Sequence, residues 1–310
     1  MKNWYKSTLL IITLLISFSA IAEKTINIAV IDTGIDPMHP LFNGKLMVGS
    51  TSATKSSYGL DFSSLNGEVN YRPYDQNGHG THIAGIIAKI NPKAKLHILK
   101  YYNPEADGYQ NLQATIRALK YAIDNNMDVI NYSSGGPEQS PQEAALFKQA
   151  RDKGILIISA AGNEFRNIDA SGSAGFYPAS YDYENIITVG ALDKKMKKVG
   201  SSNWGTRSVD IFAPGKKIKS AFPNFQLAEM TGTSQATAFV TGAVSLILEK
   251  KSYLSKEEKF TRVKNMLFKT GYHSNRLKSL CLSSKALNIK GLKKYLSQRS
   301  LASIQTASTR

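Results

Sequence analysis

The run Ile-Asn-Ile-Ala-Val-Ile at residues 26–31, followed by Asp32-Thr33-Gly34, decides the fold of this chain. A short apolar run that stops at Asp and Gly is typical of a strand buried on both faces of a sheet. Similar runs recur at residues 95–101, 128–132, 154–160, 186–192 and 209–213, and helical patterns separate them at about 80–90, 111–126, 142–153 and 234–250. This alternation predicts an α/β fold with a doubly wound, mostly parallel sheet and helices on both faces.

The composition agrees with one sizeable folded domain. Of the 310 residues, 42% are hydrophobic and 20% are charged, which excludes a disordered or collagen-like chain. The single cysteine, Cys281, has no intramolecular partner, so the fold does not depend on disulfides, and we expect this side chain to be buried as a small apolar residue.

The first 22 residues have the pattern of a cleavable signal peptide. Lys2 and Lys6 precede an apolar run from Leu9 to Ile21, and Ala20-Ile21-Ala22 supplies small residues where a signal peptidase cuts. The alternative is a membrane anchor, but the run falls short of the roughly 20 apolar residues that span a bilayer. We therefore expect residues 1–22 to be removed and the mature protein to be secreted, to the periplasm or outside the cell.

Positive charge is concentrated near the carboxyl terminus. The formal net charge is +16, and residues 251–310 hold 14 Lys and Arg against 2 Asp and Glu, or +12. Helices are predicted at 255–269, where Ser255 and Glu258 form a capping box, and at about 285–298. The second of these is basic and amphipathic, with Ile289, Leu292 and Leu296 on one side.

Two interpretations of this basic helix stay open. The apolar stripe either packs on the domain and leaves a solvated face, which we favour, or residues 251–310 contact an anionic surface. No nucleic-acid partner is expected. One folded domain, which includes the basic C-terminal helices, is predicted to span residues 23–298, and residues 299–310 are predicted to form a disordered tail.

Candidate functional residues follow the predicted strands. In an open parallel sheet, ligands bind beyond the carboxyl ends of the strands. Asp32 ends the first strand, Ser133-Ser134-Gly135-Gly136 follows the strand at 128–132, and Ala160-Ala161-Gly162-Asn163 closes the strand at 154–160. We expect these three segments to meet at one edge of the sheet.

The segment Asn77-Gly78-His79-Gly80-Thr81-His82 contains the candidate base. His79 lies in a glycine-flanked turn at a helix start, where little bulk would block a substrate. His82, one turn further on, is expected to be a packed, hydrogen-bonded core residue. A metal site on the two histidines lacks the Glu and the i, i+4 spacing of the zinc-binding helix motif, so no metal or other cofactor is expected.

Ser234 is the candidate nucleophile. Gly232-Thr233-Ser234 opens the apolar helix at 234–250, where the helix dipole favours a developing oxyanion. The alternative is that Ser234 merely caps the helix, since Ser is a preferred N-cap residue. The Gly-x-Ser-x-Gly elbow of α/β-hydrolases is absent, because Ala236 stands at the second glycine position and the histidine precedes the serine.

Taken together, these pieces resemble the subtilisin family of serine peptidases. The matching segments, in order, are VIDTGID at 30–36, NGHGTHIAG at 77–85, AIDNNMDVINYSSGG at 122–136, SAAGNE at 159–164, FAPG at 212–215 and GTSQATAFVTG at 232–242. The resemblance implies that Asp32 orients His79, that His79 takes the proton of Ser234, and that Asn163 stabilises the oxyanion with the Ser234 backbone N–H.

The resemblance also implies a pocket for the substrate. Its walls would be Ser133, Ser134, Gly135 and Gly136 on one side and Ala160, Ala161 and Gly162 on the other. The backbone of 133–135 would pair with an extended peptide as an added strand.

Several departures from the family pattern are visible. Only a few residues separate Ala22 from the first strand, so the usual inhibitory pro-domain is not expected and folding proceeds unaided or with help from another chain. The predicted helix after His79 runs straight into Asn91-Pro92-Lys93, which leaves no room for the family's usual calcium loop there. Ser134 replaces a larger apolar residue, which weakens the expected preference for a bulky side chain further up the peptide.

The sequence thus predicts a secreted serine endopeptidase that acts on peptides or proteins. The alternative is an inactive binding protein of the same fold that holds anionic surfaces through residues 251–310.

Overall fold

The computed structural model describes residues 24–46, 49–51, 54–171, 175–251 and 254–308. The predicted signal peptide at residues 1–22 lies outside this part of the chain.

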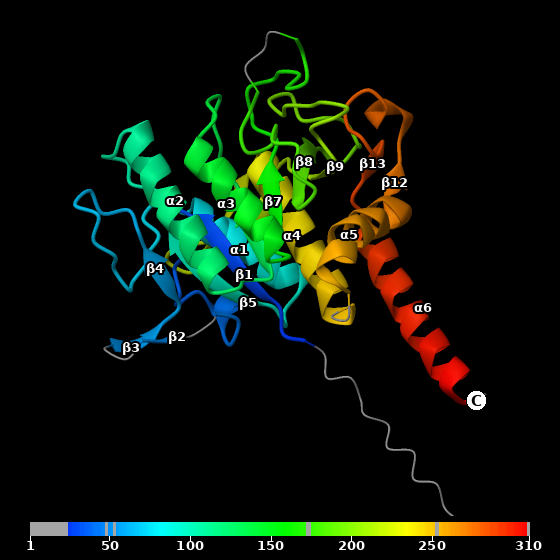
Figure 1. The fold of residues 1–310 in the computed structure, drawn as a ribbon, viewed down its shortest axis with the longest axis horizontal. Helices are drawn as coiled ribbons and strands as arrows, with labels where there is room; N and C mark the ends of the chain where they lie inside the picture. Colours follow the sequence, from blue (N-terminus) through cyan, green and yellow to red (C-terminus); the bar gives the residue numbers. More distant parts are fainter. Residues whose placement is uncertain (1–23, 47–48, 52–53, 172–174, 252–253, 309–310) are drawn as a thin grey trace, which may run out of the picture.

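A nine-stranded sheet forms the middle layer of the molecule (Figure 1). Its order is β12 (Tyr272–His273), β13 (Lys285–Ala286), β9 (Ile211–Pro214), β8 (Ile186–Leu192), β7 (Leu156–Ala160), β6 (Val129–Tyr132), β1 (Asn27–Asp32), β5 (Lys95–Lys100) and β4 (Gly59–Asp61). All neighbours in this sheet pair in parallel except β12 and β13. The chain extends the sheet in both directions from β1, so the predicted doubly wound, mostly parallel sheet is confirmed.

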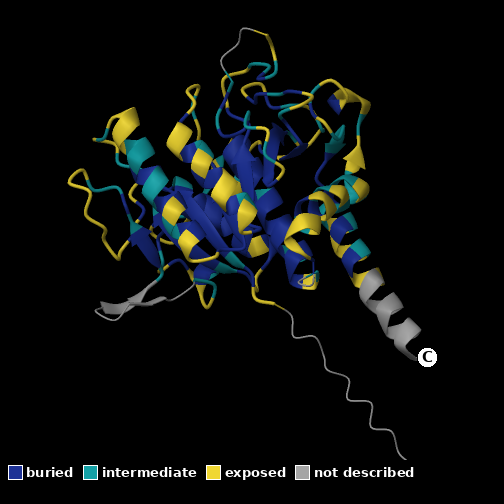
Figure 2. Ribbon diagram, viewed as in Figure 1, coloured by how far each residue is buried: buried dark blue, intermediate teal, exposed yellow. Residues whose placement is uncertain are grey.

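Helices cover both faces of the sheet. Their bounds are α1 (His79–Ile90), α2 (Gly108–Asp124), α3 (Pro141–Asp152), α4 (Thr233–Lys250), α5 (Lys256–Thr270) and α6 (Ile289–Ser308), with short 3-10 turns at Pro40–Phe42 and Asn275–Leu277. The pair α1 and α4 packs on one face, and the pair α2 and α3 packs on the other. In Figure 2 the central strands of the sheet are buried while the outer sides of α2 and α3 are exposed.

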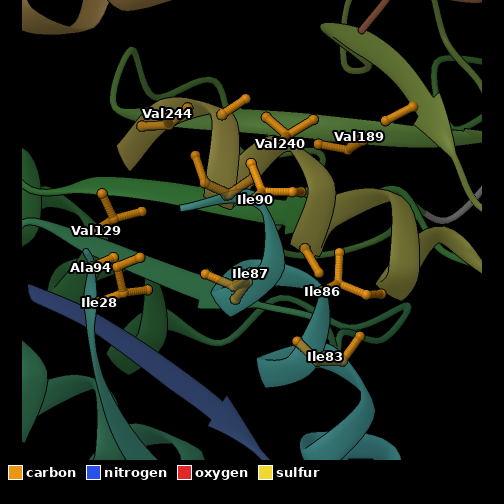
Figure 3. Packing of buried hydrophobic residues seen from close by; sticks show 14 of the residues in the cluster. Ile28, Ile83, Ile86, Ile87, Ile90, Ala94, Val129, Val189, Val240 and Val244 are labelled. Atoms are coloured by element: carbon orange, nitrogen blue, oxygen red, sulfur yellow. The ribbon is translucent and has the colours of Figure 1, made fainter. Parts of the chain in front are cut away.

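Alternate residues of β1 serve two different cores. Ile28 and Val30 belong to the cluster formed with α1 and α4, whereas Ala29 and Ile31 belong to the cluster formed with α2 and α3. Figure 3 shows the first cluster, in which Ile28 lies near Ile87 of α1. Because successive side chains of a strand point to opposite faces, a strand buried on both faces must be apolar throughout.

Several short elements escaped the sequence patterns. Strands β10 (Ile218–Phe222) and β11 (Gln226–Met230) form an antiparallel hairpin that packs on α1, and β2 (Gly49–Thr51) pairs with β3 (Thr54–Ser57). The hairpin carries a mixture of charged and apolar residues without regular alternation, so periodicity alone did not reveal it.

The basic helix α6 packs against the domain. Leu292 is fully buried and Leu296 nearly so, both within the same cluster as α1 and α4, while Lys290 and Lys294 are exposed. The packed interpretation of the apolar stripe is therefore confirmed. None of the helices in the described part of the chain is long and apolar enough to cross a membrane.

The helix α6 also continues beyond its predicted end. It runs past residue 298 to Ser308, into the segment predicted as a disordered tail. Residues 292–310 contain neither Gly nor Pro, so nothing in the local sequence stops the helix where the prediction placed its end.

Candidate active site

Strand register brings the predicted segments together at one edge of the sheet. Ile31 of β1 is paired with Tyr132 of β6, and Tyr132 is paired with Ser159 of β7. The residues that follow these three are Asp32, Ser133 and Ala160, which therefore stand side by side at the carboxyl ends of adjacent strands. This is the position expected for a ligand site in an open parallel sheet.

Asp32 and His79 form a hydrogen-bonded pair. His79 Nδ1 lies 2.7 Å from Asp32 Oδ1, which also accepts the Thr33 N–H at 2.8 Å. Asp32 is buried, whereas the His79 side chain keeps 27% of its surface exposed. The ring is thus held by one nitrogen to a buried carboxylate while part of the ring faces solvent.

The environment of His79 favours its protonated form. Burial lowers the pKa of the imidazole, but the charge of Asp32, the hydrogen bond to Asp32 and the charge of Asp75 outweigh burial and raise it. The pKa of His79 is therefore above its ordinary value of 6.5.

A buried carboxylate that sequence reasoning missed positions this turn. Asp75 is 1% exposed and accepts hydrogen bonds from the hydroxyls of Thr33 and Thr81 and from the backbone N–H groups of Asn77, Gly78 and Thr81, at 2.6–3.0 Å. It therefore joins the end of β1 to the first turn of α1. The only sequence signal was an acidic residue four positions before His79, which is common in loops.

Ser234 lies in the first turn of α4 but does not cap it. The N-cap is Gly232, so the interpretation of Ser234 as a plain helix cap is wrong. Ser234 is 8% exposed, its Oγ donates to the carbonyl oxygen of Ser133 at 3.0 Å, and among the described residues its backbone N–H has no hydrogen-bond partner. No hydrogen bond joins Ser234 and His79 within the described chain.

Asn163 supplies the cap of α4 from another loop. Its Oδ1 accepts the Thr233 N–H at 3.0 Å and the Thr233 hydroxyl at 3.3 Å. In a carboxamide the nitrogen lies on the side opposite the oxygen, so the Nδ2 group remains as a donor next to the start of α4. Asn163 is exposed and Ser234 is the next residue after Thr233, so two N–H donors that have no partner among the described residues lie near each other.

A buried polar network ties α4 to β6 beneath the site. The Thr241 hydroxyl donates to Asn131 Oδ1 at 2.8 Å, Asn131 Nδ2 donates to Ser133 Oγ at 2.9 Å, and Ser133 Oγ donates to the Ser234 carbonyl at 3.4 Å. Burying a polar group costs free energy unless the group is paired, so this series of hydrogen bonds favours one placement of Ser234 relative to Ser133.

The segments predicted as pocket walls adopt defined positions. Gly136 pairs with Tyr177 through N–H to O bonds of 2.9 and 2.7 Å, and Ser134 is half-buried. On the other side, Ala160 and Ala161 are buried, and Gly162 has φ of +97°, where a side chain would be strained.

His82 is a core residue, as predicted. It is fully buried, and its Nε2–H donates to the carbonyl oxygens of Ile218 at 2.9 Å and Ala228 at 3.1 Å, which links α1 to the β10–β11 hairpin. Burial lowers its pKa. Cys281 is also buried, as expected.

The region predicted to lack a calcium loop is a simple helix end. Helix α1 stops at Ile90, and Asn91 bonds through its side chain to the Ser245 hydroxyl and the Lys93 N–H. Within the described ranges, no group of three or more His, Cys, Asp or Glu side chains is placed to hold a metal ion.

A serine in the first turn of a helix, near an Asp–His pair at the carboxyl edge of a parallel sheet, is an arrangement typical of serine hydrolases. A model of the subtilase family matches residues 23–293. The chain therefore belongs to the subtilase family. Its relatives in this family include serine proteases.

Individual relatives support the same assignment. The major intracellular serine protease of Bacillus subtilis (strain 168) is 34% identical over 248 residues, which cover 77% of this chain and 72% of that protein. Subtilisin E of the same organism is 37% identical over 237 residues, which cover 73% of this chain, so the chain spans only 56% of that relative's length.

Solved structures agree on the fold. The prenylagaramide maturation protease PagA aligns with a TM-score of 0.65 at 27% identity, over 87% of this chain and 94% of its own. A cold-adapted subtilisin-like serine proteinase aligns with a TM-score of 0.67 at 24% identity, over 86% and 91%.

Proposed function

We propose that the protein is a serine endopeptidase that cleaves peptide bonds through Asp32, His79 and Ser234. The observation that carries this proposal is the 2.7 Å bond between His79 and the buried Asp32, at the sheet edge where Ser133 contacts Ser234. That bond leaves Nε2 of His79 as the ring nitrogen available to a substrate or nucleophile.

In acylation, the Ser234 hydroxyl leaves its bond to the Ser133 carbonyl and gives its proton to His79 Nε2. Ser234 Oγ forms a bond to the scissile carbonyl carbon, and the charge that develops on the carbonyl oxygen is stabilised by Asn163 Nδ2 and the Ser234 N–H. His79 then protonates the leaving amine as the C–N bond breaks. Water, activated by the same imidazole, hydrolyses the acyl-enzyme.

The present bond between Ser234 and Ser133 is compatible with this role. Catalytic hydrogen bonds are often long or misaligned before substrate binds and tighten in the complex. An extended peptide pairing with the backbone of 133–135 would bring its carbonyl to Ser234 and engage the Ser133 carbonyl.

Labelling by a fluorophosphonate tests the proposal, because the probe reacts only with an activated serine. The parent should be labelled at Ser234 and should hydrolyse peptides, whereas Ser234→Ala should lose about 10⁶ in turnover, the magnitude known for the serine of subtilisin itself. Ser245→Ala, a buried serine further along α4, is the matched control and should retain activity. Activity in Ser234→Ala, or labelling elsewhere in the chain, would contradict the assignment.

Secretion is a separate part of the proposal and rests on residues 1–22 alone. The major intracellular protease of Bacillus subtilis shows by its name that members of the family also act inside cells. Mass spectrometry of the protein recovered from its source should find an amino terminus near Glu23, and an intact Met1 would overturn the expectation.

A further inference from the structure

The two predicted walls of the substrate pocket face the same aromatic ring. A Cβ atom built on Gly135 would lie 2.5 Å from Cε1 and 2.9 Å from Cζ of Phe176. A Cβ atom built on Gly162 would lie 2.9 Å from Cδ2 of that ring. The ring therefore occupies the space that opens between the two glycines.

Phe176 is held in this position from both sides of its own backbone. Its N–H donates to Ser180 Oγ at 3.0 Å and its carbonyl accepts the Ser180 N–H at 2.8 Å. The next residue, Tyr177, pairs with Gly136 through two backbone bonds. Because the backbone is fixed at both residues, the ring can leave the space only by changing its rotamer.

The ring is also part of a buried cluster. Phe176 is 7% exposed and packs in the same cluster as Ala161, Ile168 and Ala179. A rotamer change would take the ring out of this cluster and expose apolar surface, which costs free energy.

We propose that Phe176 is a specificity-determining residue that restricts the pocket to small side chains. This proposal rests on the proposed function, since the space between the two walls is a substrate pocket only if the chain cleaves peptides at Ser234. The residue that supplies the scissile carbonyl would be Gly, Ala or Ser. A Phe or Leu side chain there would need the volume that the Phe176 ring already fills.

Two matched substrates test this proposal. They are tetrapeptide p-nitroanilides that differ only in the last residue, Ala or Phe. The parent should have a kcat/KM at least about 10-fold higher for Ala than for Phe, since steric discrimination in apolar pockets reaches about 10–200-fold. Phe176→Ala should raise kcat/KM for the Phe substrate by at least about 10-fold and change the Ala substrate far less.

Phe165→Ala is the matched control. It also removes an aromatic ring near Asn163, but Phe165 is 65% exposed and its ring packs against Trp204. This variant should keep the preference of the parent. Thermal melts of both variants establish that they are folded, and the preference of the parent decides the question even if Phe176→Ala does not fold.

A binding measurement separates this proposal from the proposed function. Calorimetry on the Ser234→Ala variant measures the affinity for uncleaved peptides that end in Ala or Phe. The peptide that ends in Ala should bind more tightly, and adding Phe176→Ala should reverse this order of affinity. If the parent cleaves neither substrate, the proposed function fails while the binding ranking still tests Phe176. A parent that prefers Phe, or a preference unchanged by Phe176→Ala, overturns the proposal.

Discussion

At the scale of single residues, Asn163 uses the two halves of its carboxamide for different tasks. The oxygen caps α4 through Thr233, and the nitrogen is the donor assigned to the oxyanion. In the proposed mechanism, one residue therefore couples the placement of the nucleophile to the stabilisation of the transition state, and substitutions can separate the two effects.

Asn163→Leu should remove both the cap of α4 and the oxyanion donor, whereas Asn163→Asp should remove only the donor. We expect turnover to fall by about 10²–10³ in the Leu variant with little change in KM, because the lost interaction exists mainly in the transition state. The Asp variant should lose at least as much, since a negative charge would face the oxyanion. Only the Leu variant should lose about 1 kcal/mol of stability with the cap. A loss confined to KM would make Asn163 a substrate-binding residue instead.

The raised pKa of His79 predicts how kcat/KM depends on pH. His79 acts as a base only when neutral, so kcat/KM should rise with pH through a midpoint above 6.5 and then level off. Asp32→Asn removes the charge that raises the pKa and leaves burial, which lowers it. The midpoint should therefore move to lower pH, and turnover should fall by about 10⁴. A midpoint that stays in place or rises in Asp32→Asn would show that another group controls the profile.

At the scale of elements, the placement of His79 depends on how α1 begins. The helix has no side-chain cap at Gly78, and Asp75 instead accepts the N–H groups of Gly78 and Thr81 together with the Thr33 hydroxyl at the end of β1. The close approach of the first turn of α1 to the segment after β1 also requires glycine at position 80, because a Cβ there would lie 2.2 Å from the Gly34 carbonyl oxygen. The proposed base is thus placed by a loop that bridges two elements.

Asp75→Asn should destabilise the protein by about 3 kcal/mol. The amide has one acceptor oxygen in place of two, and its NH₂ group would face hydrogens that now point at the carboxylate. Chemical denaturation measures the change. Asp107→Ala is the matched control, since Asp107 is an exposed aspartate that caps α2, and it should cost only about 1 kcal/mol. Equal effects of the two variants would mean that Asp75 is an ordinary helix cap.

At the scale of the whole molecule, the carboxyl-terminal helix belongs to the core although its surface is basic. Helix α6 packs on α4 and α5, and Leu292 lies in the cluster that also contains residues of α1 and β1. The Lys293 Nζ donates to the Ile90 carbonyl at the end of α1. The helix therefore connects the carboxyl-terminal part of the chain to the helices that begin at His79 and Thr233.

Leu292→Asp should lower stability by about 4 kcal/mol, because a carboxylate would replace a fully buried side chain without a partner. The double variant Lys290→Gln with Lys294→Gln should leave the Tm within error, since both side chains are exposed. Differential scanning calorimetry distinguishes the two.

The same double variant tests the contact with anionic surfaces. Binding to anionic vesicles that weakens with salt and disappears in this variant would establish that contact.

Much of the architecture could be predicted because it depends on local pattern. A strand such as Asn27–Asp32 must be apolar on both faces, and a helix such as α4 must present apolar residues along its length, so both leave a signal in any window of sequence. Asp32, His79, Asn163 and Ser234 could be proposed as site residues for the same reason, as each lies in a short motif at the end of such an element. The β10–β11 hairpin and the far end of α6 were missed because their boundaries depend on packing partners distant in the chain.

By itself, the sequence determined which residues carry reactive groups and which strands and helices present them. The tertiary structure alone decided how those groups are paired. Sheet register set Asp32, Ser133 and Ala160 side by side, and a side chain from the 160–163 loop replaced Ser234 in the role of helix cap. Only the packed molecule also placed the Phe176 ring between Gly135 and Gly162, which precede it by 41 and 14 positions. Such contacts are set by how the loops pack, so they leave no periodic pattern in the sequence.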